Sequence, residues 1–178
     1  RNSGDTKWNE VHTLRADYDA DMCCLITDGR DTAWCGWAYG FTYTSYANMF
    51  QATAYNCATG NYTFAHEFGH TQGCRHDNDG NLSPFPYGHG FRNGGNWRTV
   101  MGLAGGTGAV RLNYWSNPNI NSPVWPFTAM GTPVSGGSFA NDCRTALNVG
   151  DATVVNHEAT QANSSAPNGE TFGNDEVA

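Results

Sequence analysis

The residues best suited to chemistry lie together in residues 66–77, which read His-Glu-Phe-Gly-His-Thr-Gln-Gly-Cys-Arg-His-Asp. On a helix, His66 and His70 would project from the same face, one turn apart. Gly73 allows a sharp turn without a Cβ clash, and His76 follows it three residues later. Three neutral imidazoles suit a zinc ion and leave a fourth position open for water, as catalytic zinc requires.

Glu67 directly follows the first of these histidines, and on a helix its carboxylate leans toward the metal. Zinc activates water near neutral pH, and the carboxylate can take a proton from that water and pass it to a departing amine. A structural zinc site would instead complete its coordination with a fourth protein ligand and would have no use for Glu67. The pattern therefore predicts hydrolysis of an amide bond.

A helix must position these side chains, and residues 61–73 form the clearest helical segment, with Gly73 suited to end it in a left-handed conformation. The remaining elements can be assigned more coarsely. We expect a short helix at 7–15, a buried strand at 20–27, an extended aromatic segment at 34–43, a polar edge strand at 47–55, irregular structure at 75–137, a closing helix at 139–157 and a loosely held polar tail at 161–178.

The composition bounds the class of protein. The 178 residues suit one domain, which we expect to be a single catalytic domain over residues 1–160, with an upper part to about 73 and a lower part from about 74. The net charge of -7 argues against nucleic acid or an anionic membrane surface as a partner. We expect a monomer that acts on protein or peptide substrates.

Six cysteines in a small chain predict disulfides and a secreted, extracellular protein. The best single pairing is Cys35 with Cys57, which flank one extended segment. Cys23 and Cys24 would point to opposite faces of a strand and would need different partners. The many Asp and Asn residues leave calcium open as a second ion, although they form no compact oxygen-ligand loop that would support it.

The extended motif of residues 66–77 resembles the signature of the metzincin zinc metallopeptidases. The resemblance implies a methionine turn under the metal, which matches Thr99-Val100-Met101-Gly102, with Met101 as an apolar floor beneath the imidazoles. Met130 is a weaker candidate for that role. The implied fold is α+β, with a mixed sheet and the zinc helix above a cleft. An irregular lower part would carry the methionine turn and the closing helix.

Asp77, directly after the third histidine, resembles the adamalysin or reprolysin branch, and we expect it to anchor the following loop by hydrogen bonds. Other branches place a fifth-ligand tyrosine where this chain has Leu103. A closer resemblance, to the bacterial peptidyl-Asp metallopeptidases, rests on three segments: 57–65, 86–91 and 111–118. It covers the middle third of the chain strongly and residues 17–157 loosely.

That resemblance implies cleavage on the amino side of acidic residues, for which a guanidinium in the substrate pocket is the physical counterpart. Arg111 is our hypothesis for this group, with Tyr114 as a second pocket candidate and an internal ion pair as the alternative role of Arg111. Arg92 and Arg98 are rivals. An apolar pocket, or a zinc-bearing binding or toxin-like module with vestigial activity, are the competing interpretations.

Three further expectations concern the surroundings of the site. His89 is expected to be structural, since three histidines already complete a catalytic set. The strand at 47–55 is a candidate for pairing with an extended substrate along its free edge. Metzincins place a strand and a long helix before the strand at 20–27, where this chain has few residues. Either the chain starts inside the usual fold or a piece is missing, and a missing piece predicts an exposed sheet edge or completion by a partner.

Overall fold

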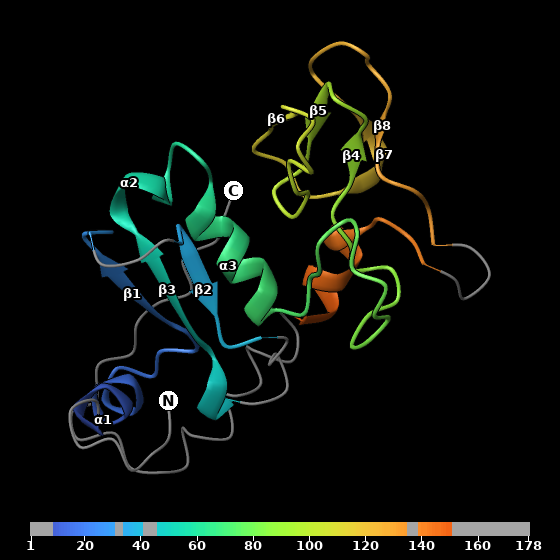
Figure 1. Ribbon diagram of the computed structural model, residues 1–178. Coiled ribbons are helices and arrows are strands. Elements are labelled where there is room, and N and C mark those ends of the chain that lie inside the picture. Colours follow the sequence, from blue (N-terminus) through green and yellow to red (C-terminus); the bar gives the residue numbers. More distant parts are fainter. Residues whose placement is uncertain (1–8, 31–33, 41–45, 135–138, 151–178) are drawn as a thin grey trace.

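The computed structural model describes residues 9–30, 34–40, 46–134 and 139–150. The expected tail at 161–178, residues 151–157 of the expected closing helix and residues 41–43 of the aromatic segment lie outside this part of the chain. Two structural halves follow each other along the chain (Figure 1). The first carries a three-stranded sheet and the longer helices, and the second is dominated by loops and short strands.

The first half is built on a mixed sheet with the strand order β1-β3-β2 (Figure 1). Strand β1 (Cys23–Thr27) runs parallel to β3 (Phe50–Ala54), and β2 (Gly36–Ala38) runs antiparallel to β3. Helix α1 (Asn9–Asp17) precedes the sheet. A 3-10 turn, Tyr46–Asn48, leads into β3.

The expectation of an edge strand at residues 47–55 is wrong, because β3 is the central strand and pairs on both sides. The polar residues that suggested an edge, Gln51 and Thr53, are 4% and 1% exposed. Side-chain polarity was a poor guide here, because pairing is decided by which strands lie beside the backbone.

The prediction of a buried strand at residues 20–27 is corrected in the same way. Strand β1 lies at the edge of the sheet, and Leu25 and Ile26 are 46% and 52% exposed. An apolar run indicates a buried strand only when layers cover both of its faces.

Helices α2 (Tyr55–Ala58) and α3 (Thr63–Thr71) follow the central strand, and α3 packs against β2 and β3. The chain enters α3 through Tyr62, which has a left-handed backbone with φ of 55°. It leaves through Gly73, whose φ is 98°, as predicted for the end of this helix. A Cβ on Gly73 would lie 2.8 Å from the ring of Phe85, so both conformation and space favour glycine there.

The second half contains two small sheets and one helix (Figure 1). Strands β4 (Arg92–Asn93), β5 (Trp97–Arg98) and β6 (Val110–Arg111) form one sheet. Strands β7 (Asn117–Asn121) and β8 (Ala129–Met130) form the other. Residues 143–150 are helical, within the range of the predicted closing helix.

The main core lies beneath α3, where the loop after the helix meets the segment around Met101 and the helix at residues 143–150. Its buried members are Cys74, Phe85, Val100, Met101, Cys143, Ala146 and Leu147. Cys74 and Met101 are fully buried. This core fixes the position of the segment after α3 relative to the helix.

The predicted disulfide between Cys35 and Cys57 is present, with a Cα–Cα distance of 5.4 Å. The other cysteines, Cys23, Cys24, Cys74 and Cys143, form no disulfide in the described structure, contrary to the broader expectation from their even number. Cys74 and Cys143 are instead part of the apolar core.

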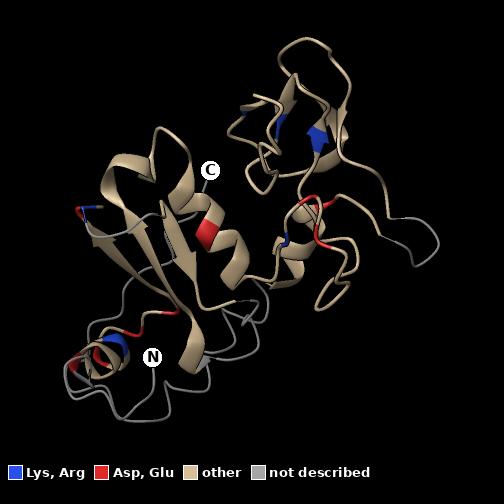
Figure 2. Ribbon diagram, viewed as in Figure 1, with Lys and Arg blue, Asp and Glu red and all other residues tan. Residues whose placement is uncertain are grey.

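Charged residues are sparse, and basic ones recur on the β4-β5-β6 sheet (Figure 2). Among the described helices, none has the length and apolar character needed to cross a membrane.

Candidate metal centre

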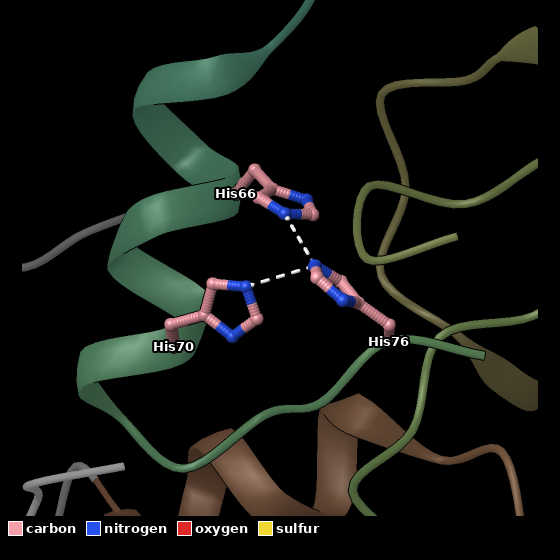
Figure 3. A group of neighbouring side chains, drawn as sticks. All are labelled: His66, His70 and His76. Carbon is pink, nitrogen blue, oxygen red and sulfur yellow. Dashed lines mark hydrogen bonds between the residues drawn. The ribbon is translucent and has the colours of Figure 1, made fainter. Parts of the chain in front are cut away.

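His66, His70 and His76 converge on one point (Figure 3). His66 and His70 project from α3, and His76 reaches them from the segment after Gly73. The Nε2 atom of His76 lies 3.1 Å from Nε2 of His66 and 3.0 Å from Nε2 of His70. The predicted ligands are therefore brought together in the structure.

The hydrogen-bond partners of Nδ1 in His66 and His70 determine whether the Nε2 atoms of these residues carry a proton. Nδ1 of His66 lies 2.8 Å from the carbonyl oxygen of Val100, and Nδ1 of His70 lies 2.9 Å from that of Cys74. A carbonyl only accepts, so in the neutral rings each Nδ1 carries the proton. The Nε2 lone pairs of both residues are then unprotonated and directed toward His76. Such a cluster fits a cation, and the carbonyl contacts are the outer partners that orient metal-binding histidines.

The electrostatic surroundings keep these rings neutral. Burial, together with the neighbouring histidine, lowers the pKa of His66 to about 3 and that of His70 to about 4. Burial also lowers the pKa of His76. Neutral imidazole is the form that donates a lone pair to a metal, so the triad is ready to bind a divalent cation at neutral pH.

Glu67 lies on α3 next to His66 and is 6% exposed. Burial raises the pKa of its carboxyl group to about 7, and the charge of Arg111 acts in the opposite direction. A carboxylate with a pKa near neutrality is suited to take a proton and release it again.

Met101, the residue predicted to lie in a methionine turn, is fully buried. Its sulfur is so close to α3 that a Cβ on Gly69 would approach it to 2.6 Å. The same Cβ would lie 2.8 Å from the ring of Trp115. Met130, the weaker candidate, is buried in β8.

Asp77 anchors the loop after His76 to the segment after the methionine. Its Oδ1 accepts a hydrogen bond from the backbone N–H of Leu103 at 2.8 Å. Its Oδ2 pairs with Nε of Arg92 at 3.3 Å, and the carboxylate is 8% exposed. The geometry agrees with the predicted anchoring role.

A cavity of about 600 Å³ opens over the three histidines. Its described lining residues are Trp34, Cys35, Gly36, Trp37, Ala38, Gly40, Thr63, His66, Glu67, His70, His76, Asp79, Leu103 and Arg111. Strand β2 therefore contributes one part of the lining, and Leu103 and Arg111, which follow Met101 in the chain, contribute another. Tyr114, the second pocket candidate, is not among these lining residues, and its side chain is 41% exposed.

Arg111 is the arginine among the described lining residues. Its guanidinium donates to the carbonyl oxygen of Asn61 at 2.8 Å and to that of Gly102 at 3.4 Å. Its Nε–H is buried and has no hydrogen-bond partner within the described part of the chain. Burial and the charge of Arg98 lower the pKa of Arg111 to about 10, so it remains a cation at neutral pH.

The rival arginines lie in the same row, because Arg92 pairs with Arg98 across β4 and β5, and Arg98 pairs with Arg111 across β5 and β6. The guanidinium of Arg98 is occupied by the carbonyl oxygens of Ala109 and Gly102, at 2.9 and 2.8 Å. Neither rival lines the cavity. The sequence did not reveal this row, because no local pattern shows that three separate strands pair in this register.

His89 lies apart from the metal cluster, as expected. It is fully buried, and its Nε2 lies 3.1 Å from the carbonyl oxygen of Asn81. Its ring also contacts that of Phe139, with centroids 4.1 Å apart.

Comparisons with known proteins agree with this geometry. A family model described as metallopeptidase family M12 matches residues 2–116. A peptidyl-Asp metalloendopeptidase of Xanthomonas campestris pv. campestris is 41% identical over 150 residues, which cover 83% of this chain and 34% of that protein. One of Stenotrophomonas maltophilia is 40% identical over 161 residues, covering 87% of this chain and 36% of the relative.

A third relative, the peptidyl-Asp metalloendopeptidase of Pseudomonas fragi, is 49% identical over 77 residues, covering 42% of this chain and 54% of the relative. The chain thus spans about a third of the length of the first two curated relatives. No solved structure matches.

Proposed function

Because this chain belongs to metallopeptidase family M12, we propose that it is a zinc-dependent endopeptidase whose metal is held by His66, His70 and His76. The observation that carries the proposal is the convergence of the Nε2 atoms of three neutral histidines beside a buried carboxylate, in a cavity open to solvent. Histidine nitrogens are typical zinc ligands, and three of them leave a coordination position for chemistry.

When bound, zinc supplies a Lewis acid for the carbonyl of the peptide bond and for the attacking water. Glu67 acts as the general base, which takes a proton from that water and then passes it to the departing amine. The proton stays on Glu67 between these two steps. A pKa near 7 makes both transfers favourable at neutral pH.

Strand β2 is the element suited to hold an extended substrate. It lies at the edge of the sheet, pairs with β3 on one side, and lines the cavity with residues 36–38. A peptide can add to such an edge through backbone hydrogen bonds. This role passes to β2 from the strand at 47–55, because β3 has no free edge.

A preference for cleavage before acidic residues is the finer part of the proposal. The relatives are named peptidyl-Asp metalloendopeptidases, and Arg111 supplies a cation in the cavity wall. A guanidinium can bind a carboxylate through two parallel hydrogen bonds. The competing candidate is an apolar pocket, which is favoured by Leu103 and Trp37 in the same lining.

We also propose that the protein is secreted and acts as a monomer. The disulfide between Cys35 and Cys57 supports secretion, since such bonds form and persist in oxidising compartments.

The test is a digest of a denatured protein, with every new terminus mapped by mass spectrometry, alongside a chelator-treated sample and the variant Glu67→Ala. Cuts that cluster before Asp and disappear in both controls support the proposal. Cuts before apolar residues would keep the peptidase and remove the acidic preference. Activity that survives Glu67→Ala would contradict the proposed base.

A further inference from the structure

We propose that Gly36 is a positioning residue for Glu67: the missing side chain at this point of β2 is what lets the Glu67 carboxylate face the cavity. This inference rests on the proposed function, because it assigns a role to Gly36 in the same site. Gly36 and Glu67 both line the cavity, and they come from the edge strand and the metal helix.

The contact between the two elements is too close for any side chain at position 36. A Cβ there would lie 2.6 Å from Oε1 and 2.7 Å from Cγ of Glu67, and 2.6 Å from Cγ2 of Thr63. All three distances are below 3.0 Å, so a neighbouring atom would have to move. Gly36 is not among the residues with positive φ, so its backbone conformation is open to alanine. The restriction is therefore one of space alone.

The strand itself is held firmly. Gly36 pairs with Thr53 in the sheet, and the carbonyl oxygen of Cys35 accepts a hydrogen bond from Ala54 N–H at 2.8 Å. The disulfide joins Cys35 to Cys57 on α2, just before the metal helix. These connections fix the start of β2 against α3 and oppose movement of its backbone away from the helix.

The side chain of Glu67 is the part that can yield. Within the described part of the chain its carboxylate interacts with the charge of Arg111, and no hydrogen bond fixes its orientation. Rotation about its side-chain bonds moves the carboxylate at little cost, whereas Thr63 is β-branched, 4% exposed and stiff. An alanine at position 36 therefore turns the Glu67 carboxylate away from the cavity. The remaining contact with the Thr63 methyl group is relieved by a small shift of the local backbone, which leaves the three histidines in place.

The experiment compares Gly36→Ala with Gly60→Ala. Gly60 lies between α2 and α3, lacks a positive φ, and a Cβ there would meet nothing within 4 Å. For each variant, kcat and KM on a fluorogenic peptide, zinc content and melting temperature are measured. We expect Gly36→Ala to lower kcat by about 100-fold or more while KM stays within about twofold, since misplacing a catalytic group by about 1 Å has this effect. Zinc content is expected to match wild type, and Gly60→Ala to behave as wild type throughout.

A crystal structure of each zinc-loaded variant supplies a readout that does not depend on activity. The carboxylate of Glu67 should be displaced by roughly 1 Å or more in Gly36→Ala and unmoved in Gly60→Ala. Three outcomes would overturn the inference. They are an unmoved carboxylate with β2 shifted instead, a rise in KM with kcat preserved, and full rescue of Gly36→Ala by Thr63→Ser. A wild-type chain without peptidase activity would refute the proposed function, and the two crystal structures would still decide the contact.

Discussion

Arg98 and Arg111 lie directly opposite each other on β5 and β6, and both donate hydrogen bonds to the carbonyl oxygen of Gly102, at 2.8 and 3.4 Å. Like charges in direct cross-strand register repel each other. In the described structure, the carboxylate paired with this row is that of Asp77, on Arg92. The row therefore has a surplus of positive charge beside the cavity, which favours a negatively charged group of a ligand.

Replacing Arg111 tests this idea about specificity. For peptides that differ only in Asp or Asn after the scissile bond, we expect Arg111→Ala to reduce the ratio of their kcat/KM values by about tenfold or more. Arg111→Lys should retain part of the preference, since lysine keeps the charge and loses the two-pronged geometry. Arg30→Ala is the control, because Arg30 is 82% exposed and forms its ion pair with Asp28. A preference that survives Arg111→Ala would assign it to another residue.

The dependence of kcat/KM on pH should show the ionisation of Glu67 on its acid side. A general base must be ionised, so kcat/KM should rise with pH as this carboxyl group, with a pKa raised by burial to about 7, loses its proton. The charge of Arg111 lowers this pKa. Removing that charge in Arg111→Ala should therefore move the acid limb to higher pH, measured with an uncharged peptide. A limb that stays in place would show that the two groups are not coupled.

Removal of the metal should lower stability as well as activity. A cation bound by the folded state stabilises it by mass action, and its removal should lower the free energy of unfolding by about 2–4 kcal/mol. In a domain of this size, that loss lowers the melting temperature by roughly 5–15 °C. Calorimetry with and without a chelator measures the change. His12→Ala should respond as wild type does, because His12 lies on α1, contacts Phe50 and is not part of the histidine cluster. His76→Ala should show a low melting temperature that the chelator no longer changes.

Loss of the Asp77 anchor should destabilise the loop that carries His76. Asp77→Ala leaves the Leu103 N–H and the Arg92 guanidinium without their carboxylate, at a cost of about 1–3 kcal/mol in the free energy of unfolding. Asp28→Ala is the matched control, because its pair with Arg30 is solvent-exposed and contributes about 0–1 kcal/mol at most. Urea unfolding measures the free energy of unfolding of both variants. Equal losses of this free energy would mean that the Asp77 anchor contributes no more than a surface ion pair.

The sequence alone identified the three histidines that the structure brings together, because their geometry is local. The spacing of His66 and His70 on one helix, and the turn at Gly73 that returns the chain to His76, need only the period of a helix and the freedom of a glycine. The pairing of Cys35 with Cys57, which flank one extended segment, was also predicted from the sequence and is confirmed. Met101 was predicted from the resemblance to a family, and the structure places it in the core next to the helix.

The tertiary structure alone decided which strand borders the cavity and what stands beside Glu67. The strand at residues 47–55 became central and β2 became the cavity wall, because sheet order depends on contacts between residues far apart in the chain. The row of Arg92, Arg98 and Arg111 and the approach of Gly36 to Glu67 have the same origin. A single sequence records the period of each element, whereas the register between elements is set by packing and pairing at long range.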